Sequence, residues 1–251
     1  ILFMSLTLIG LGLYSELDLS LRAIEEAKKS DRVYIELYTS KWHGDLQSLE
    51  KLIGKEIVEL KRKNLEENSS KIIEESKKSK VVVFVQGDPL VQTTHSVLLS
   101  EARKLGIETK VVHNSSVLSA VGETGLHVQK FGPYVTIPFP EKTKGKPPES
   151  IFEIIDENKK RGLHTLCLLD VISESDRYMK INEGLDILLS NGRIGRKDKI
   201  VIFAKAGSDK PLILYESAET IINHEIEDIP TVIIIPGKLH FTEKEYLEQF
   251  I

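Results

Sequence analysis

The segment from Val81 to His95, which reads VVVFVQGDPLVQTTH, constrains the fold of this chain more than any other segment. Residues 81–85 are an unbroken apolar run, mostly β-branched, as expected for a strand buried on both faces of a parallel sheet. Gln86-Gly87-Asp88-Pro89 then ends the strand, because glycine permits unusual backbone angles and proline removes a hydrogen-bond donor. The segment therefore predicts an acidic loop at the carboxyl end of a sheet, where ligands bind in open α/β folds.

Strands and helices alternate along the rest of the chain. We expect Thr93 or Thr94 to cap the helix after this loop, and Gly106 to end it. Further strands are expected at 6–9, 33–37, 56–60, 110–112, 165–169, 200–204 and 231–235. Further helices are expected at 19–29, 46–53, 65–78, 151–161, 180–189 and near residue 246. This alternation predicts a parallel sheet with helices on its faces.

A change of composition marks the expected domain boundary. The segment 138–150, PFPEKTKGKPPES, contains four prolines and has no apolar periodicity, which is typical of a linker. We therefore expect two α/β domains, an N-terminal one at 1–138 and a C-terminal one at 149–251, joined by a linker at 139–148. A ligand is expected in the cleft between them.

Charge and cysteine content exclude several classes of protein. The net charge is −4 with a pI near 6.0, so no global positive field favours nucleic acid or anionic membrane as a partner. The N-terminal apolar stretch, 1–15, has no basic start and is expected to be a strand rather than a secretory signal. The single cysteine, Cys167, lies in an apolar run and is expected to be a buried structural thiol, which fits a reducing compartment.

Each short motif, considered alone, is weak evidence for a particular function. Ile9-Gly10-Leu11-Gly12 resembles a dinucleotide fingerprint, but Ser15 stands where the third glycine is needed. The seven histidines are scattered without metal-ligand spacing, so no metal site is predicted. Asp88 has the strongest functional claim, and the alternative is an Asx turn that caps the loop.

The motifs are informative as an ordered set. The members are Ile9-Gly10-Leu11-Gly12-Leu13-Tyr14, Glu36 to Ser40, Gly87 to Val91 with Thr93-Thr94-His95, Thr124 to His127, Lys130-Phe131-Gly132, Arg161 to Leu166, Leu169-Asp170, Ala206-Gly207-Ser208 and Pro236 to His240. Together they resemble the tetrapyrrole-methylase-like class of S-adenosylmethionine-dependent methyltransferases, in its diphthine branch. The resemblance covers essentially the whole chain.

The resemblance implies two α/β domains that bind S-adenosylmethionine in the cleft between them, and a homodimer. By matching position, the expected cofactor contacts are Leu13, Asp88, Val91, Ser116, Val117, Leu169, Ala206 and Thr231. Such a set supplies the apolar walls and backbone groups that the cofactor needs. Asp88 would bind the ribose hydroxyls or the ammonium group, or favour the sulfonium electrostatically.

The resemblance also implies the reaction. The acceptor would be the amino group of a modified histidine on translation elongation factor 2, methylated during diphthamide biosynthesis in the cytoplasm, with S-adenosylhomocysteine as the second product. Alignment of the methyl donor with the amine can by itself lower the activation barrier by ~7 kcal/mol or more. A desolvated amine near a sulfonium loses its proton readily, so we assign no catalytic residue. The alternatives are a tetrapyrrole or ribosomal RNA methyltransferase of the same fold, or an adaptor without activity.

Overall fold

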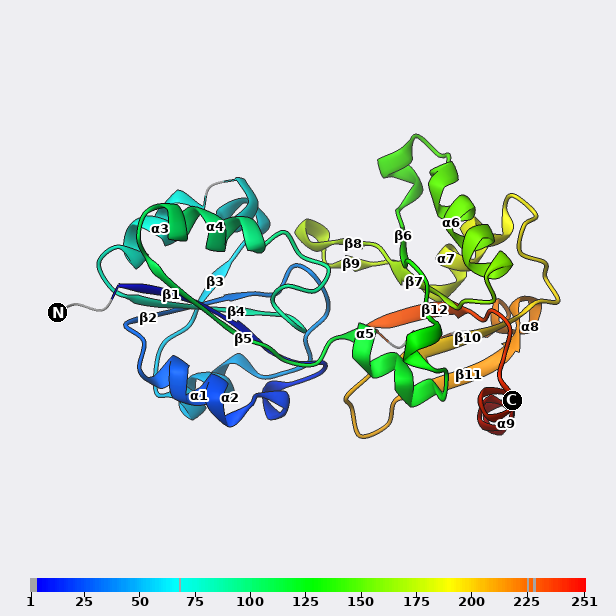
Figure 1. The fold of residues 1–251 in the computed structure, drawn as a ribbon, viewed down its shortest axis with the longest axis horizontal. Coiled ribbons are helices and arrows are strands. Elements are labelled where there is room, and N and C mark those ends of the chain that lie inside the picture. Colours follow the sequence, from blue (N-terminus) through cyan, green and yellow to red (C-terminus); the bar gives the residue numbers. More distant parts are fainter. Residues whose placement is uncertain (1–3, 68, 225, 228) are drawn as a thin grey trace. The chain divides into compact units, whose positions relative to one another are not determined.

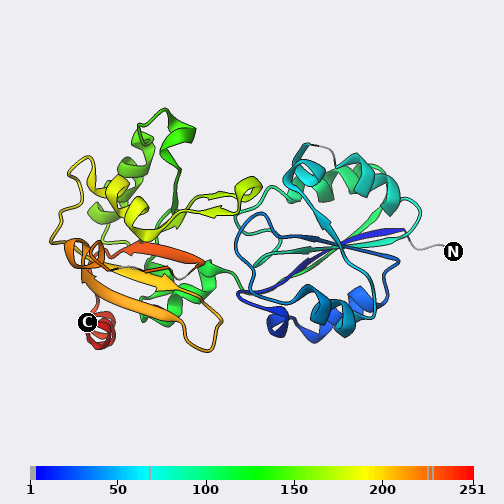
Figure 2. The ribbon, with the colours of Figure 1, turned by 180° about the vertical axis from the view of Figure 1, so that it is seen from behind.

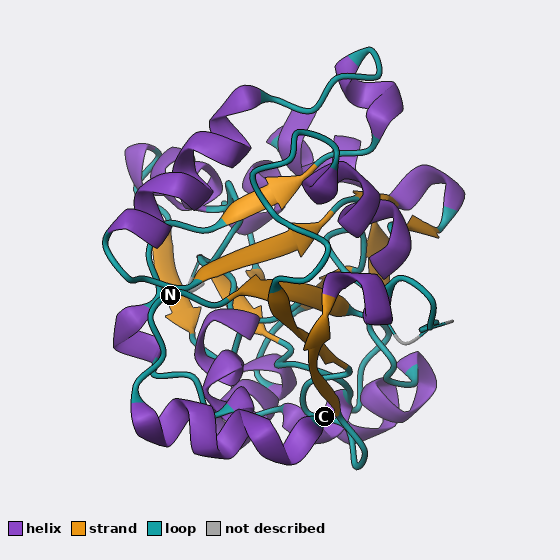
Figure 3. Ribbon diagram, turned by 90° about the vertical axis from the view of Figure 1, so that its right-hand side faces the viewer, coloured by secondary structure: helices purple, strands orange, loops and turns teal. Residues whose placement is uncertain are grey.

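The structure, a computed structural model, describes residues 4–67, 69–224, 226–227 and 229–251. Its contacts divide the chain into two compact units, unit 1 from Ile1 to Val117 and unit 2 from Leu118 to Ile251 (Figure 1). Helices and strands are mixed throughout, which confirms the expected α/β class (Figure 3). Residues 1–3 of the expected first domain lie outside the described residues.

A parallel sheet forms the centre of unit 1. Its five strands lie in the order β3-β2-β4-β1-β5, and every pairing between neighbours is parallel. The strands are β1 (Ser5–Gly10), β2 (Arg32–Glu36), β3 (Val58–Leu60), β4 (Lys80–Val85) and β5 (Glu108–Val112). All of the strands expected in this part of the chain are confirmed. The carboxyl ends of all these strands therefore lie at one edge of the sheet.

Helices cover both faces of this sheet, α3 and α4 on one face and α1 and α2 on the other (Figures 1 and 2). The helices are α1 (Leu21–Lys28), α2 (Leu46–Ile53), α3 (Ser70–Ser76) and α4 (Ser96–Lys104). Val81, Val83 and Val85 of β4 pack with α3 and α4, whereas Val82 and Phe84 pack with α1 and α2. Because alternate residues of a strand face opposite sides, a strand between two helical layers must be apolar throughout.

Unit 2 contains a mixed sheet in the order β11-β10-β12-β7-β6. Only β6 and β7 pair in parallel, and the other neighbours are antiparallel. The strands are β6 (Val135–Ile137), β7 (Thr165–Leu169), β10 (Lys199–Ala204), β11 (Leu212–Ser217) and β12 (Thr231–Ile235), with a small separate hairpin of β8 (Val171–Ile172) and β9 (Arg177–Tyr178). Strand β11 was not expected from the sequence, and the expected parallel arrangement is wrong for most of this sheet. A hairpin returns the chain directly from β10 to β11, so no helix separates them.

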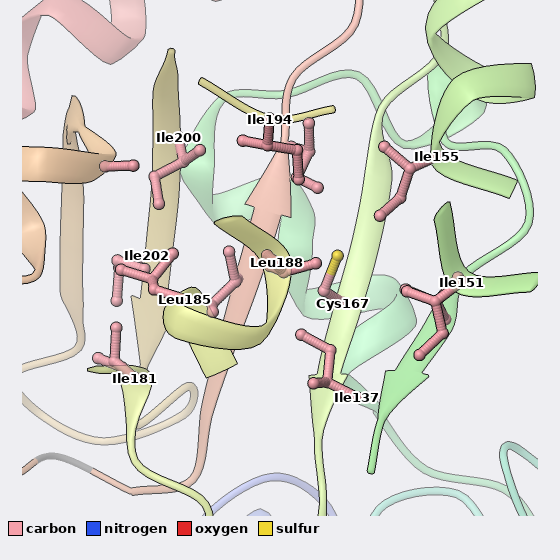
Figure 4. Close-up of a cluster of buried hydrophobic side chains, with 14 of the residues drawn as sticks. Ile137, Ile151, Ile155, Cys167, Ile181, Leu185, Leu188, Ile194, Ile200 and Ile202 are labelled. Carbon is pink, nitrogen blue, oxygen red and sulfur yellow. The ribbon is translucent and has the colours of Figure 1, made fainter. Parts of the chain in front are cut away.

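The core of unit 2 combines buried residues of this sheet with buried residues of three α-helices, which begin at Glu149, Ile181 and Ala218. The helices of the unit are α5 (Val117–Ala120, which begins at the boundary), α6 (Glu149–Lys160), α7 (Ile181–Leu189), α8 (Ala218–Ile221) and α9 (Phe241–Leu247). Cys167 lies among apolar side chains such as Ile137, Ile155 and Leu188 (Figure 4), and burial raises the pKa of its thiol. The expectation of a buried structural thiol is confirmed.

The division between the units lies earlier in the chain than the expected linker. The strand β6 pairs with β7, so the chain has already joined the second sheet before residue 139. Within the expected linker, Phe139 is fully buried and its N–H donates to Asp170 Oδ2 at 2.9 Å. Lys142 Nζ lies 2.8 Å from Asp170 Oδ1. The prolines of this segment thus belong to a loop that is packed onto unit 2.

Candidate functional site

Two glycine-containing loops meet at the carboxyl edge of the unit 1 sheet. Gly12 and Gly87 exchange backbone hydrogen bonds, with N···O distances of 3.2 and 3.0 Å. A Cβ atom added at Gly10 would lie 2.5 Å from the Gly87 carbonyl oxygen, so that position has no room for a side chain. The loops after β1 and β4, which are neighbouring strands, are therefore held against each other.

The side chain of Asn114 joins a third loop to this pair. Its Nδ2 donates to the carbonyl oxygen of Gly10 at 3.0 Å and to that of Asp18 at 3.1 Å. Asn114 follows β5, which pairs with β1 on the side opposite to β4. We call this arrangement the Asn114 clamp. It brings together the loops that follow three adjacent strands.

Asp88 lies at the centre of these loops and is only 6% exposed. Its Oδ1 accepts the N–H of Leu90 at 3.0 Å, which is the Asx-turn geometry expected as the structural alternative. Its Oδ2 accepts the N–H of Asn114 at 3.2 Å and lies 2.8 Å from His113 Nδ1. The carboxylate thus does more than cap its own loop, because it also binds the loop after β5.

The remaining cofactor contacts expected in unit 1 lie on the same three loops. Leu13 and Val91 are partly exposed; the Leu13 carbonyl accepts from Gln86 Nε2 at 3.4 Å, and the Val91 N–H donates to Asp88 O at 3.2 Å. Ser116 is buried and Val117 is partly exposed. The structure therefore brings the unit 1 members of the expected set to one edge of one sheet.

The cofactor contacts expected in unit 2 also share one sheet edge. Leu169 ends β7, Thr231 begins β12, and Ala206 follows the end of β10 by two residues. The register pairs Thr231 with Ala204, and Val232 with Leu168. Thr231 also lines a cavity of about 420 Å³ together with Met179, Ile181 and Ile229. Leu169, Ala206 and Thr231 are thus neighbours within unit 2.

A second buried carboxylate at the unit 1 edge was undervalued by sequence reasoning. Glu36 ends β2, is fully buried, and accepts hydrogen bonds from the Thr39 hydroxyl at 2.9 Å and from the N–H groups of Tyr38 and Gln86 at 3.3 Å. Burial raises its pKa to about 7, although these hydrogen bonds oppose the shift. The signal in the sequence was an acid at the end of an apolar strand. Its carboxylate joins the loop after β2 to Gln86, next to Asp88.

His95 is buried at the end of the loop that follows β4. It is the N-cap residue of α4 without a side-chain capping bond, and its Nε2 lies 3.5 Å from the Tyr38 hydroxyl. Burial lowers the pKa of its imidazole. The expected cap by Thr93 or Thr94 is wrong, because the Thr93 hydroxyl instead donates to the Pro89 carbonyl at 2.6 Å.

Glu243, a buried carboxylate of unit 2, was not predicted from the sequence. Several histidines of the motifs listed above surround it. Fully buried Glu243 accepts from Lys130 Nζ, from the N–H groups of His127 (2.8 Å) and His240 (2.6 Å), and from His164 Nε2 (3.0 Å). Burial alone would raise the pKa of Glu243, but these donors hold it at about 2. The signal in the sequence was the spacing of His240 and Glu243, which form a capping box. These motif residues therefore stabilise the fold.

Two further features concern metal ligands and membrane-spanning helices. Among the described residues, no group of three or more histidine, cysteine, aspartate or glutamate side chains could hold a metal ion. No helix in that part of the chain has the length and apolar character required to span a bilayer.

The family model of Tetrapyrrole (Corrin/Porphyrin) Methylases matches residues 5–221, which is most of the chain. The match includes the unit 1 sheet edge together with Leu169 and Ala206 of unit 2, and it ends before Thr231. The chain therefore belongs to the tetrapyrrole methylase family, and it is a methyltransferase enzyme.

Within this family the chain is similar to diphthine synthases. It is 44% identical over 252 residues to the diphthine synthase of Methanocaldococcus jannaschii, a match that covers 97% of both chains. It is 41% identical over 248 residues to that of Methanococcus aeolicus, covering 96% of both. A crystal structure of diphthine synthase matches with a TM-score of 0.89 and 34% identity, covering 98% of this chain and 95% of that chain.

Proposed function

We propose that this protein transfers methyl groups from S-adenosylmethionine to the amino group of a modified histidine on translation elongation factor 2, in diphthamide biosynthesis. The observation that carries the proposal is the 44% identity, over 97% of both chains, to the Methanocaldococcus jannaschii diphthine synthase. The match to the wider family supports methyl transfer but does not specify the acceptor.

The residues of unit 1 fit this cofactor. Apolar walls suit its nucleoside and methionine parts, and a negative charge suits its ammonium and sulfonium cations. Leu13, Val91 and Val117 are partly exposed apolar side chains, and Asp88 supplies the buried carboxylate. Gln86 Oε1 is buried and has no hydrogen-bond partner among the described residues, so it remains available as an acceptor. Bound S-adenosylmethionine would supply an electrophilic methyl group at this edge.

The residues of unit 2 form a separate part of the proposal. Leu169 and Ala206 would supply apolar surface, and Thr231 would supply a hydroxyl and backbone groups. Thr231 lies at the edge of a cavity, so its substitution by valine removes a polar group while preserving the shape of the side chain. Weaker cofactor binding by T231V would support this set.

The proposal also includes a homodimer and a cytoplasmic location. Both rest on the resemblance to the diphthine branch. Light scattering on the purified protein tests the dimer, because the monomer mass is 28.3 kDa. A mass close to the monomer value at micromolar concentration would contradict it.

The decisive experiment combines the protein, radiolabelled S-adenosylmethionine and elongation factor 2 that carries the unmethylated precursor. Mass spectrometry then locates the label. Label on the modified histidine supports both the reaction and the acceptor. Cofactor binding without methyl transfer would instead favour a tetrapyrrole or ribosomal RNA as the methyl acceptor. Absence of cofactor binding would favour an adaptor that has kept the fold.

A further inference from the structure

Asp88 and His113 form a pair that cofactor binding alone does not explain. His113 Nδ1 lies 2.8 Å from Asp88 Oδ2, and the two side chains are 68% and 7% exposed, respectively. Asp88 follows β4 and His113 follows β5, so the pair joins two of the loops at the expected cofactor edge. A buried carboxylate therefore holds an imidazole that faces solvent.

The contacts of Asp88 indicate which nitrogen of His113 carries the proton. Its two oxygens accept N–H groups from Leu90 and Asn114, so the carboxylate acts as an acceptor on both sides. His113 Nδ1 then donates to Asp88, and the neutral ring has its lone pair on Nε2. Among the described residues, none forms a hydrogen bond with this Nε2. The basic nitrogen is thus oriented and accessible.

Other titratable groups at this edge are less suited to receive a proton from an external molecule. Glu36, Tyr38 and His95 are all buried. His43 is exposed, but its ring stacks on Tyr14 with a centroid distance of 4.5 Å. A base must be able to reach the proton that it accepts. The His113 side chain is 68% exposed and its Nδ1 side is held by Asp88, so its Nε2 can meet an external molecule.

Charged groups on the segments packed against His113 are engaged elsewhere. Asp18, which the Asn114 clamp contacts, uses its carboxylate to accept the N–H groups of Tyr14 and Ser15 at 2.6 and 3.2 Å. Lys110 on β5 pairs with Glu26 on α1. Asp88 is therefore the charge that acts most directly on the His113 ring.

We propose that His113 is the general base that removes the proton from the amine to be methylated, an inference that rests on the proposed function. An aliphatic amine is mostly protonated at neutral pH and must lose a proton to become a nucleophile. That proton passes to His113 Nε2. The nitrogen lone pair then forms the bond to the methyl carbon, and the breaking carbon–sulfur bond leaves its electron pair on sulfur. Asp88 stabilises the imidazolium that results.

The variant H113N separates this role from a structural one. The amide Nδ2 of asparagine can replace His113 Nδ1 as the donor to Asp88, but asparagine has no basic nitrogen. We expect kcat for methyl transfer to elongation factor 2 to fall by ~100-fold or more at pH 7. Cofactor affinity, measured by calorimetry, should stay within about twofold of wild type, because a group that acts in the chemical step lowers kcat without weakening ground-state binding. H224N, at an exposed histidine of unit 2, is the matched control.

The pH profile and the imidazole tautomer provide independent readouts. A general base produces an acid limb in the pH profile of kcat, so H113N should lack the acid limb that the wild type shows. In the cofactor-free protein, nitrogen NMR should show His113 as the Nδ1–H tautomer, and D88N should shift it towards a mixture.

Wild-type kcat and an unchanged pH profile in H113N would overturn the inference, as would loss of the acid limb in H43N instead. A tautomer mixture at His113 in the wild type would also contradict it. Failure of the wild-type protein to methylate elongation factor 2 is a different result, because it rejects the proposed function itself.

Discussion

Two buried carboxylates at the carboxyl edge of unit 1 are held in different ways. Asp88 accepts hydrogen bonds from two loops and lies next to an imidazole. Glu36 accepts, among the described residues, from neutral hydroxyl and N–H groups. A carboxylate without a cation beside it is costly to ionise when it is buried. Glu36 is therefore suited to joining loops, and Asp88 to meeting a cationic ligand.

Substitution of Asp88 by alanine should weaken S-adenosylmethionine binding by about 10- to 100-fold, because a charge-assisted contact contributes roughly 1.5–3 kcal/mol. Calorimetry measures the affinity, and circular dichroism checks the fold. D186A, which removes an exposed carboxylate on α7, should bind as wild type does. Equal affinities for the wild type and D88A would remove Asp88 from the cofactor site.

The pKa of Glu36 predicts a pH-dependent stability. It is about 7 in the folded chain and near 4.5 for an ordinary glutamate, so the folded state holds the proton more tightly. This contribution to stability is fully present below about pH 4.5 and is lost as the pH rises through 7. Over that range the free energy of unfolding should fall by up to about 3 kcal/mol more in wild type than in E36Q.

Urea unfolding at pH 5 and pH 8 measures this difference. E59Q, which changes an exposed glutamate on the neighbouring strand β3, is the control and should follow the wild type. An E36Q protein with the same pH dependence as wild type would show that Glu36 does not titrate in this range.

At the scale of the elements, the site depends on how closely the loops after β1 and β4 approach. Gly10 allows backbone to meet backbone, because a Cβ atom there would lie 2.5 Å from the Gly87 carbonyl oxygen. Gly12 and Gly87 also adopt positive φ angles of 83° and 68°, which suit glycine. These glycines are thus required by the geometry of the loops that carry Leu13 and Asp88.

The variant G10A should separate these loops. Its Cβ would lie 2.5 Å from the Gly87 oxygen and 2.7 Å from Asn114 Cβ, so we expect a loss of roughly 1–3 kcal/mol in stability and weaker cofactor binding. G54A is a useful control, because Gly54 has a positive φ but open space around it. That variant should lose about 1 kcal/mol and keep its cofactor affinity. Unchanged binding by G10A would contradict the proposed role of these loops.

At the scale of the whole molecule, the parallel sheet of unit 1 was predictable because apolar runs such as Val81 to Val85 reflect burial on both faces. The unit 1 site edge was predictable for the same reason, since Asp88 directly follows such a run. The hairpin β10–β11 was not, because the partly exposed residues of β11 carry only a weak pattern. Glu243 was also missed, because its partners at 127, 130 and 164 are distant in sequence and meet only in the folded unit.

The Glu243 cluster should contribute strongly to the stability of unit 2. In E243Q the Lys130 ammonium loses its anionic partner, so we expect a loss on the order of 3 kcal/mol at pH 7. Since the pKa of Glu243 is held at about 2, its contribution is present above about pH 4.5 and is lost as the pH falls towards 2. E243Q should therefore lose less stability in acid than wild type.

Thermal and urea unfolding between pH 3 and pH 7 measure this effect. The control is E245Q, which changes an exposed residue of α9 two positions away. If E243Q and E245Q were equally stable at pH 7, the cluster would have no net stabilising role.

The Asn114 clamp has a consequence for the protein during its synthesis. Asn114 holds Gly10 and Asp18, which precede it by 104 and 96 residues. A ribosome must therefore release nearly all of unit 1 before the clamp can close. A nascent chain that ends before residue 114 would contain the two glycine loops but would lack the hydrogen bonds from Asn114. Capture of ribosome-bound intermediates on an immobilised cofactor analogue should thus begin abruptly, once this asparagine has emerged from the exit tunnel.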